Sequence, residues 1–273
     1  MLTRLIVAAI AIPIIVLIVI LGPAWLVGLV LGAVAARCAW EFLYCTERNA
    51  AIRISIYAAV AAFFIPFLSA FYDGGRVNSI VLFLLFAVLM CELMLSFRKE
   101  RTMEFETVAA ALMAGGAFPI LMSGLVRLAL RDNGGVYALL PFVVCFASDA
   151  GGYFGGVLLG RHKLTPRISP NKTLEGSIGA FILAIVLTLL YGLILKAAKF
   201  EINFAVMGVY GFLGSLAAQL GDLSFSAVKR IFGVKDYGRL LPGHGGMLDR
   251  MDSIIWGAAL LDLLVAWVPA ITK

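Results

Sequence analysis

Residues 176–196 read Gly-Ser-Ile-Gly-Ala-Phe-Ile-Leu-Ala-Ile-Val-Leu-Thr-Leu-Leu-Tyr-Gly-Leu-Ile-Leu-Lys and hold no charged side chain before Lys196. About 20 apolar residues are enough for an α-helix to cross the hydrocarbon core of a bilayer. The whole chain of 273 residues is 62% hydrophobic and only 14% charged, whereas soluble domains are about 25% charged. The composition therefore predicts an integral membrane protein.

Apolar runs of this kind recur along the whole chain, separated by turn-forming residues such as Gly22-Pro23 and Asp73-Gly74-Gly75. They predict about nine transmembrane helices, and hence an all-α, polytopic membrane protein. The first two runs could instead form one re-entrant hairpin. The expected spans are 5–21, 24–44, 54–72, 78–97, 106–128, 136–159, 176–196, 203–224 and 252–270.

One stretch near the C-terminal end, residues 226–252, is polar. It reads Ser-Ala-Val-Lys-Arg-Ile-Phe-Gly-Val-Lys-Asp-Tyr-Gly-Arg-Leu-Leu-Pro-Gly-His-Gly-Gly-Met-Leu-Asp-Arg-Met-Asp. Cations suit phosphates, carboxylates suit a divalent metal, and glycines let the backbone approach a ligand, so the mixture predicts a site for a metal-bound polyphosphate. The alternative is a basic loop that touches lipid headgroups. Such a loop requires neither Pro-Gly-His-Gly-Gly nor carboxylates spaced among cations.

This stretch resembles the signature of the phosphatidate cytidylyltransferases (CDP-diacylglycerol synthases). Their pattern runs Ser-x-x-Lys-Arg, four residues, Lys-Asp, a small residue two further on, then Pro-x-His-Gly-Gly, two residues and Asp-Arg-x-Asp. Every fixed position is met here, by Ser226, Lys229, Arg230, Lys235, Asp236, Gly238, Pro242, His244, Gly245, Gly246, Asp249, Arg250 and Asp252. In chain order, we therefore expect N-terminal transmembrane helices in 1–135 and a catalytic region in 136–273, together forming one integral membrane unit.

The resemblance implies that CTP and phosphatidic acid react to give CDP-diacylglycerol and pyrophosphate. A phosphate oxygen of the lipid attacks the α-phosphorus of CTP, and this nucleophile is already largely ionised near neutral pH, so a general base is dispensable. The protein must instead align two anions and neutralise the leaving charge, a task for metal, Lys and Arg.

A metal pair is expected from Asp222 and Asp249. If the helix of span 203–224 continues, Asp222, Ser226 and Lys229 share one face at i, i+4 and i+7, and the carboxylate of Asp222 could meet that of Asp249. Two carboxylates plus phosphate oxygens commonly hold Mg²⁺, and the resemblance implies the same use. Asp149, Asp236 and Asp252 are further metal candidates, although Asp252 could simply be a favourable charge at a helix N-terminus.

Individual roles follow as hypotheses. The expected catalytic residues are Asp222, Asp249, Lys229, Arg230 and His244. The expected substrate-binding residues are Ser226, Lys235, Asp236, Gly245, Gly246, Arg250, Arg167, Ser169, Asn171, Lys172 and Thr173. The expected cofactor is Mg²⁺, and a second cation such as K⁺ is left open.

The last five binding residues named come from the loop 160–176, which carries four cations before span 176–196. Asn171 or Thr173 could cap that helix, and a helix N-terminus is itself an anion site. Capping alone would not explain the cations. The loop resembles the second polar region of the same family, with Ser-Pro-Asn-Lys-Thr and Glu-Gly in matching places, so the resemblance is close over about residues 145–256.

Ionisable residues inside apolar spans are functional candidates. Asp149 is one, with a carboxylate paired for helix packing as the alternative. Gly152, Gly156 and Gly160, like Gly151 and Gly155, recur every four residues, a spacing that permits close helix contact within the chain or in a homodimer. Arg37 and Glu41 are four residues apart, so we expect them to pair with each other and do not place them in the site.

Most Lys and Arg residues fall on the side of the membrane that also holds residues 226–252. The positive-inside rule therefore predicts a multi-pass protein of the cell (inner) membrane with its active site facing the cytoplasm. The expected partners are the two substrates and the lipid bilayer; no basic domain suggests nucleic acid. The alternatives are a cytidylyltransferase for another lipid phosphate and a membrane transporter, although transporters tend to have repeated halves and charges at mid-membrane.

Overall fold

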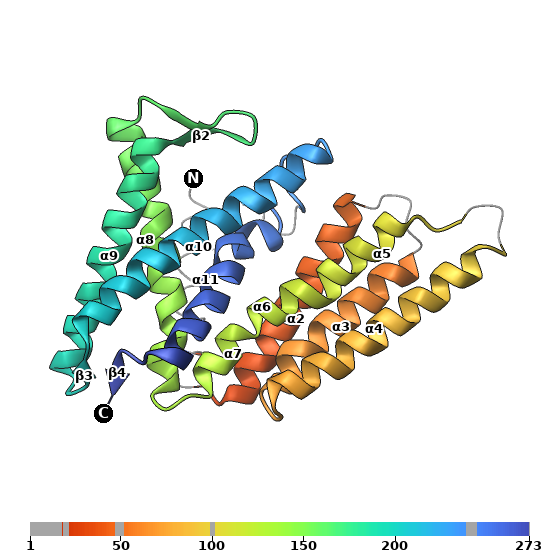
Figure 1. Cartoon of the computed structure of the whole chain (residues 1–273), viewed down its shortest axis with the longest axis horizontal. Coiled ribbons are helices and arrows are strands. Elements are labelled where there is room, and N and C mark those ends of the chain that lie inside the picture. Colours follow the sequence, from red (N-terminus) through yellow and green to blue (C-terminus); the bar gives the residue numbers. More distant parts are fainter. Residues whose placement is uncertain (1–17, 19–21, 47–51, 99–101, 239–244, 273) are drawn as a thin grey trace. The chain divides into compact units, whose positions relative to one another are not determined.

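The computed structural model describes residue 18 and residues 22–46, 52–98, 102–238 and 245–272, and these are almost entirely helical (Figure 1). The long helices are α2 (Ala24–Thr46), α3 (Ile52–Ser69), α4 (Gly74–Ser96), α8 (Gly134–Leu159), α9 (Leu174–Ala197), α10 (Phe204–Ile231) and α11 (Leu248–Trp267). Between α4 and α8 the chain forms α5 (Phe105–Leu112), the π-helical turn η1 (Met113–Ala117), α6 (Phe118–Met122) and α7 (Gly124–Ala129). The protein is therefore an all-α, polytopic membrane protein.

Within the described residues, seven segments are long and apolar enough to cross a membrane. They confirm the expected spans from 24–44 to 203–224, with the segment Phe105–Ala129 counted as one. The expected span 5–21 lies outside the described residues, so the hairpin alternative and the count of nine stay predictions. The expected span 252–270 is helical as α11, but this helix carries Asp249, Asp252 and Asp262 and is not among the seven.

Large apolar side chains are exposed along these helices. On α4 they include Ile80 and Phe83, and on α9 they include Ile182 and Leu190. Exposed apolar surface on this scale is unusual in a soluble monomer, and it suits helices that contact lipid chains.

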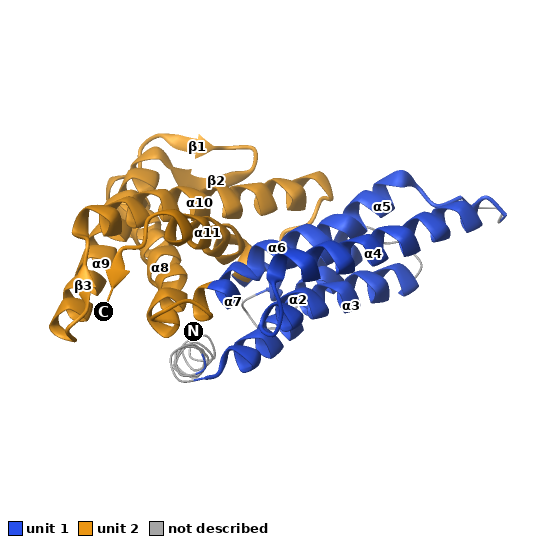
Figure 2. Cartoon of the chain, turned by 60° about the horizontal axis from the view of Figure 1, so that its bottom comes forward, with its two compact units in different colours: residues 1–127, 236–250 blue, residues 128–235, 251–273 orange. Residues whose placement is uncertain are grey.

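The chain forms two compact units, which are coloured separately in Figure 2. Unit 1 contains residues 1–127 together with 236–250, and unit 2 contains residues 128–235 and 251–273. Much of the polar signature thus packs with the N-terminal helices, although it follows them by more than a hundred residues. The expected division at 135/136 describes chain order and stays a prediction.

In unit 1, α2 packs closely against α3 because small residues face the contact. A Cβ atom on Gly32 would lie 2.6 Å from the carbonyl oxygen of Phe63. The π-helical turn η1 also approaches α3, since a Cβ on Gly115 would lie 2.8 Å from the Cα of Ala58. Apolar side chains such as Leu43, Ile65 and Leu89 fill the interior.

In unit 2, α8 and α9 pack through glycines. A Cβ on Gly151 would lie 2.4 Å from the carbonyl oxygen of Gly179, and a Cβ on Gly176 would lie 2.8 Å from that of Gly152. The regular glycine spacing therefore serves contact between two helices of the same chain.

Two small antiparallel sheets mark the ends of unit 2 (Figure 1). The hairpin of β1 (Lys163–Thr165) and β2 (Ser169–Thr173) joins α8 to α9. The pair of β3 (Glu201–Ile202) and β4 (Ile271–Thr272) joins the connection between α9 and α10 to the end of the described chain. Thr173 caps α9, because its hydroxyl accepts a hydrogen bond from the backbone N–H of Gly176 at 3.1 Å; the predicted capping role is confirmed.

Candidate active site

The first group of expected site residues lies in unit 2, where α10 continues past residue 224 to Ile231. The continuation places Asp222 and Ser226 on one helical face as predicted, and the Ser226 hydroxyl donates to Asp222 Oδ1 at 3.2 Å. From β2, the Lys172 ammonium group lies 2.5 Å from Asp222 Oδ2. Lys172 and Asp222 remain 28% and 32% exposed, so a ligand can reach the pair.

Lys229 lies one turn after Ser226 on the same helix, and both residues are buried. A buried ammonium group needs compensating charge, and the nearby carboxylate of Asp252 provides part of it. The charge of Lys229 is therefore partly balanced by Asp252, and its predicted phosphate-binding role stays a prediction.

Arg230 holds the β1–β2 hairpin against the end of α10. Its Nε donates to the carbonyl oxygen of Ile168 at 3.0 Å, and its Nη1 donates to that of Val234 at 3.2 Å. The side chain is exposed, so its predicted catalytic role stays a prediction beside this structural one.

Asp252 adds a side chain from α11 to the predicted site residues of unit 2. It is buried on α11, and its charge interacts unfavourably with those of Asp222 on α10 and Asp149 on α8. Close helix approach makes this possible, because a Cβ on Gly221, next to Asp222, would lie 2.5 Å from the carbonyl oxygen of Asp252. The two predicted alternatives for Asp252, a metal ligand and a favourable charge at a helix start, therefore both stay predictions.

The second group lies in unit 1, where Asp249 closes the signature loop. Its Oδ2 accepts hydrogen bonds from the backbone N–H groups of Tyr237 and Gly246, both at 2.9 Å. These two donors flank residues 239–244, so one buried carboxylate ties the two sides of the loop together. Gly245 between them has φ +82°, a backbone conformation that favours glycine.

The other signature residues are divided between the two units. Lys235, Asp236 and Arg250 are exposed, and Asp236 lies close to Gly245. His244 lies outside the described residues. The expected meeting of Asp222 with Asp249 stays a prediction, because the two belong to different units.

The β1–β2 hairpin carries the remaining expected binding residues. Arg167 and Asn171 are exposed, Ser169 is half-buried and Thr173 is buried as the cap of α9. Glu175 anchors the start of the hairpin, because it accepts from the backbone N–H of Arg161 at 3.0 Å and contacts His162 Nδ1 at 2.6 Å. Among the hairpin residues expected in the site, Lys172 contacts another predicted site residue, Asp222.

Glu41 is a residue of this region that the sequence interpretation left out of the site. Arg37 and Glu41 form the predicted pair, with Arg37 Nε 3.0 Å from Glu41 Oε1. The second oxygen of Glu41, however, accepts a hydrogen bond from the backbone N–H of Leu248 at 3.0 Å. Like Asp149, Glu41 is an ionisable group inside an apolar span, and this feature of the sequence could have identified it.

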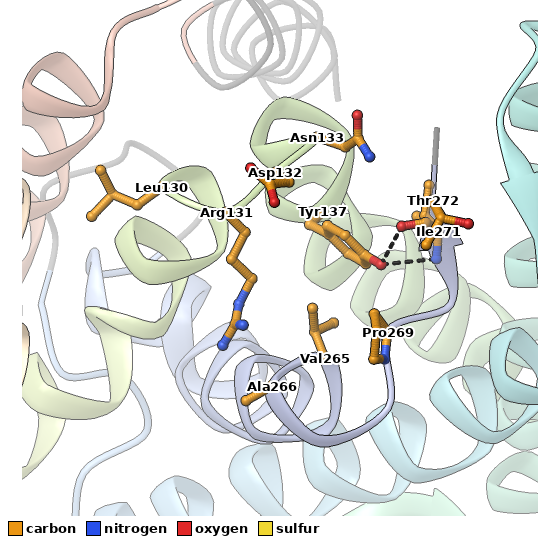
Figure 3. Close-up of a pocket in the computed structure, with 10 residues that line it drawn as sticks. All are labelled: Leu130, Arg131, Asp132, Asn133, Tyr137, Val265, Ala266, Pro269, Ile271 and Thr272. Atoms are coloured by element: carbon orange, nitrogen blue, oxygen red, sulfur yellow. Dashed lines mark hydrogen bonds between the residues drawn. The ribbon is translucent and has the colours of Figure 1, made fainter.

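A cavity of about 710 Å³ lies at the other end of unit 2 (Figure 3). It is formed by the start of α8, the end of α11 and β4, including Asn133, Val265 and Thr272. Tyr137 points into this region and bonds to Ile271, donating to its carbonyl oxygen at 2.9 Å and accepting from its N–H at 2.8 Å (Figure 3). The cavity shares no lining residue with the expected site.

Comparison with known proteins identifies the family. The family model described as "Cytidylyltransferase family" matches residues 2–268. Proteins named phosphatidate cytidylyltransferase from Staphylococcus haemolyticus and Staphylococcus saprophyticus are both 44% identical to this chain, over 137 and 135 residues. These matches cover 50% of this chain and 52% and 51% of the two relatives, so the chain spans about half the length of these relatives.

A protein of the same name from Helicobacter pylori is 38% identical over 204 residues, which cover 68% of this chain and 75% of the relative. This longer match and the family model both extend well beyond the signature. The chain therefore belongs to the cytidylyltransferase family.

Proposed function

We propose that this protein transfers the cytidylyl group of CTP to phosphatidic acid, giving CDP-diacylglycerol and pyrophosphate. The observation that carries the proposal is the complete signature in residues 226–252 of a chain that belongs to this family. The relatives named phosphatidate cytidylyltransferase support the choice of lipid substrate.

The reaction forms a bond between a phosphate oxygen of the lipid and the α-phosphorus of CTP, while the bond from that phosphorus to the β-phosphate oxygen breaks. Both reactants are anions, so alignment and charge neutralisation are the main requirements. Lys172 is suited to bind phosphate oxygens, since Asp222 orients its ammonium group. Lys229 is a second candidate, because it is a buried cation whose charge is attracted by Asp252. No side chain needs to remove a proton from the nucleophile.

The carboxylates suit Mg²⁺ bound partly through substrate. Within the described part of the chain, no cluster of three or more His, Cys, Asp and Glu side chains could hold an ion unaided. Mg²⁺ is usually held by one or two carboxylates together with substrate phosphates and water, and Asp222 already accepts a cationic group, the Lys172 ammonium. We propose Asp222, Asp249 and Asp149 as its ligands; when bound, Mg²⁺ would neutralise charge on the phosphates of CTP. A K⁺ ion remains a further proposal.

The proposed location is the cell membrane, with the site on the cytoplasmic side, where CTP is present. The excess of Lys and Arg on that side supports this orientation. A homodimer stays a prediction, because the glycine spacing that suggested it is accounted for by contact between α8 and α9.

The test measures transfer of label from CTP into a chloroform-soluble product by the purified protein in detergent, with phosphatidic acid, with and without Mg²⁺. We expect Mg²⁺-dependent product with the wild type and at least about a hundredfold less with Asp222→Asn, since charge stabilisation in a transition state is commonly worth that much. Asp132→Asn is the matched control, because Asp132 is exposed beside the cavity at the other end of unit 2.

The outcomes separate the alternatives. Product with a prenyl phosphate but not with phosphatidic acid would keep the chemistry and change the substrate. No product with any lipid phosphate would refute the proposal. Full activity of Asp222→Asn would remove Asp222 from the metal site.

A further inference from the structure

Glu41 is a buried carboxylate in the interior of α2, only 2% exposed. A buried charge is unfavourable unless it is paired and hydrogen-bonded, and both of its oxygens have partners. Oε1 accepts from Arg37 Nε at 3.0 Å, within the same helix. Oε2 accepts from the backbone N–H of Leu248, which is 207 residues away in the chain.

Leu248 is the first residue of α11. The first N–H groups of a helix have no partner within that helix, and a negative charge near them is stabilising. Glu41 therefore caps the first residue of α11, Leu248, which belongs to the same compact unit as Glu41. The capped turn also contains Asp249, the carboxylate that ties the signature loop together.

Glycines on both sides of the loop pack directly on the Glu41 carboxylate. A Cβ on Gly246 would lie 2.3 Å from Glu41 Oε2, and a Cβ on Gly238 would lie 2.6 Å from Glu41 Oε1. Real Cβ contacts are not this short, so any larger residue would displace the loop or the carboxylate. This contact provides a physical reason for glycine at two positions of the signature.

The residue after Glu41 also contacts the signature. Phe42, the next residue, packs edge-to-face on Phe118 with ring centroids 5.1 Å apart, and its ring lies 5.8 Å from that of Tyr237. Tyr237 donates its backbone N–H to Asp249. The end of α2 thus meets the signature through a hydrogen bond to Glu41 and an aromatic contact of Phe42.

We propose that Glu41 is a positioning residue for the signature: it fixes the start of α11 and the flanking glycines, and thereby sets the geometry of Asp249. The inference rests on the proposed function for its catalytic consequence. Glu41 is only 2% exposed and its oxygens bind Arg37 and Leu248, so we assign it a positioning role and not a contact with substrate. The N-terminal helices would then contribute to the reaction through this one carboxylate as well as through membrane anchoring.

The test compares Glu41→Ala, Glu41→Gln and the control Glu92→Ala by hydrogen–deuterium exchange of peptides from residues 236–250, in detergent and without substrate. Glu92 is a matched carboxylate of unit 1, because it is 14% exposed and pairs with Arg53 at 2.8 Å and with the Tyr57 hydroxyl at 3.3 Å. We expect exchange in these peptides to be about tenfold or more faster in Glu41→Ala, since a hydrogen bond to a charged acceptor is lost. Glu41→Gln should restore most of the protection, because its amide oxygen can accept from Leu248.

Steady-state kinetics add a second measurement. Glu41→Ala should lower kcat by about tenfold or more, since misplacing a catalytic group by about 1 Å can lower the rate a hundredfold, whereas the KM for CTP should change less. Glu41→Gln should recover activity in parallel with protection.

The two proposals fail separately. If the wild type shows no cytidylyl transfer but exchange changes as expected, the proposed function is wrong and the positioning role stands. If the wild type is active and Glu41→Ala leaves exchange of 236–250 unchanged, or Glu92→Ala changes it equally, the positioning role is refuted. Recovery of activity by Glu41→Gln without recovery of protection would also refute it.

Discussion

Replacing Gly246 by alanine is a sharp test of how the signature packs. In the structure, the added Cβ would lie 2.3 Å from Glu41 Oε2 and 2.7 Å from the backbone nitrogen of Gly238. Ordinary contacts of this kind begin near 3.4 Å, so the loop or the carboxylate must move by about 1 Å. Neither side can yield easily, because Glu41 is held by Arg37 and Gly246 itself donates its N–H to Asp249.

The expected magnitude follows from this displacement. Overpacking of a well-packed site costs about 1–3 kcal/mol, which lowers the unfolding midpoint by about 3–10 °C for a protein of this size. A shift of about 1 Å in a catalytic group can lower the rate about a hundredfold. Gly246→Ala should therefore lose more activity than its loss of stability explains.

The assay measures thermal unfolding and cytidylyl transfer of the purified variant in detergent, beside Gly208→Ala. Gly208 lies inside α10, and no atom lies within 4 Å of its added Cβ. Since alanine is favoured over glycine in a helix by about 1 kcal/mol, the control should be as stable as the wild type or more so, with full activity. The reasoning is refuted if Gly246→Ala matches Gly208→Ala in both measurements.

Two further predictions concern unit 2. Lys172→Ala removes the cationic partner of Asp222, so it should reduce cytidylyl transfer at least about tenfold. It should change the free energy of unfolding by less than about 1 kcal/mol, because partly exposed ion pairs contribute little to stability. The control is Lys163→Ala, on the exposed part of β1, and equal activity of the two variants would contradict the proposed role of Lys172. Gly151→Ala places a Cβ 2.4 Å from the carbonyl oxygen of Gly179, so it should separate α8 from α9 and lower the unfolding midpoint by about 3–10 °C. An unchanged midpoint would show that this helix contact is looser than the structure indicates.

Most transmembrane helices could be predicted because they depend on local composition. In a bilayer, the stable conformation of a run such as 176–196 is a helix, because a helix satisfies its own backbone hydrogen bonds. The extension of α10 to Ile231 was also predictable, since Asp222, Ser226 and Lys229 repeat at helical spacing. The segment Phe105–Ala129 was predicted as a span, but its π-helical turn at Met113–Ala117 was not, because that turn depends on close packing of Gly115 against α3.

The sequence predicted which residues form the site, but it did not predict most of the contacts between them. The signature identified Asp249 as important, but its hydrogen bonds to Tyr237 and Gly246 depend on how the loop folds back. The pairing of Lys172 with Asp222 joins residues fifty positions apart. The signature alone does not indicate which cation meets which carboxylate, because sequence spacing defines neighbours only within one helix or strand.

The sequence by itself determined that this protein spans the membrane, that its polar chemistry is concentrated in residues 160–176 and 222–252, and that it belongs with the cytidylyltransferases. These properties depend on composition and on local order of residues, which the chain carries in any conformation. Only the tertiary structure decided that residues 236–250 pack with the N-terminal helices and that Glu41 caps α11. The physical reason is that a buried carboxylate must find its partners in space, and the distant partner of Glu41 is a backbone N–H group, which every residue except proline possesses.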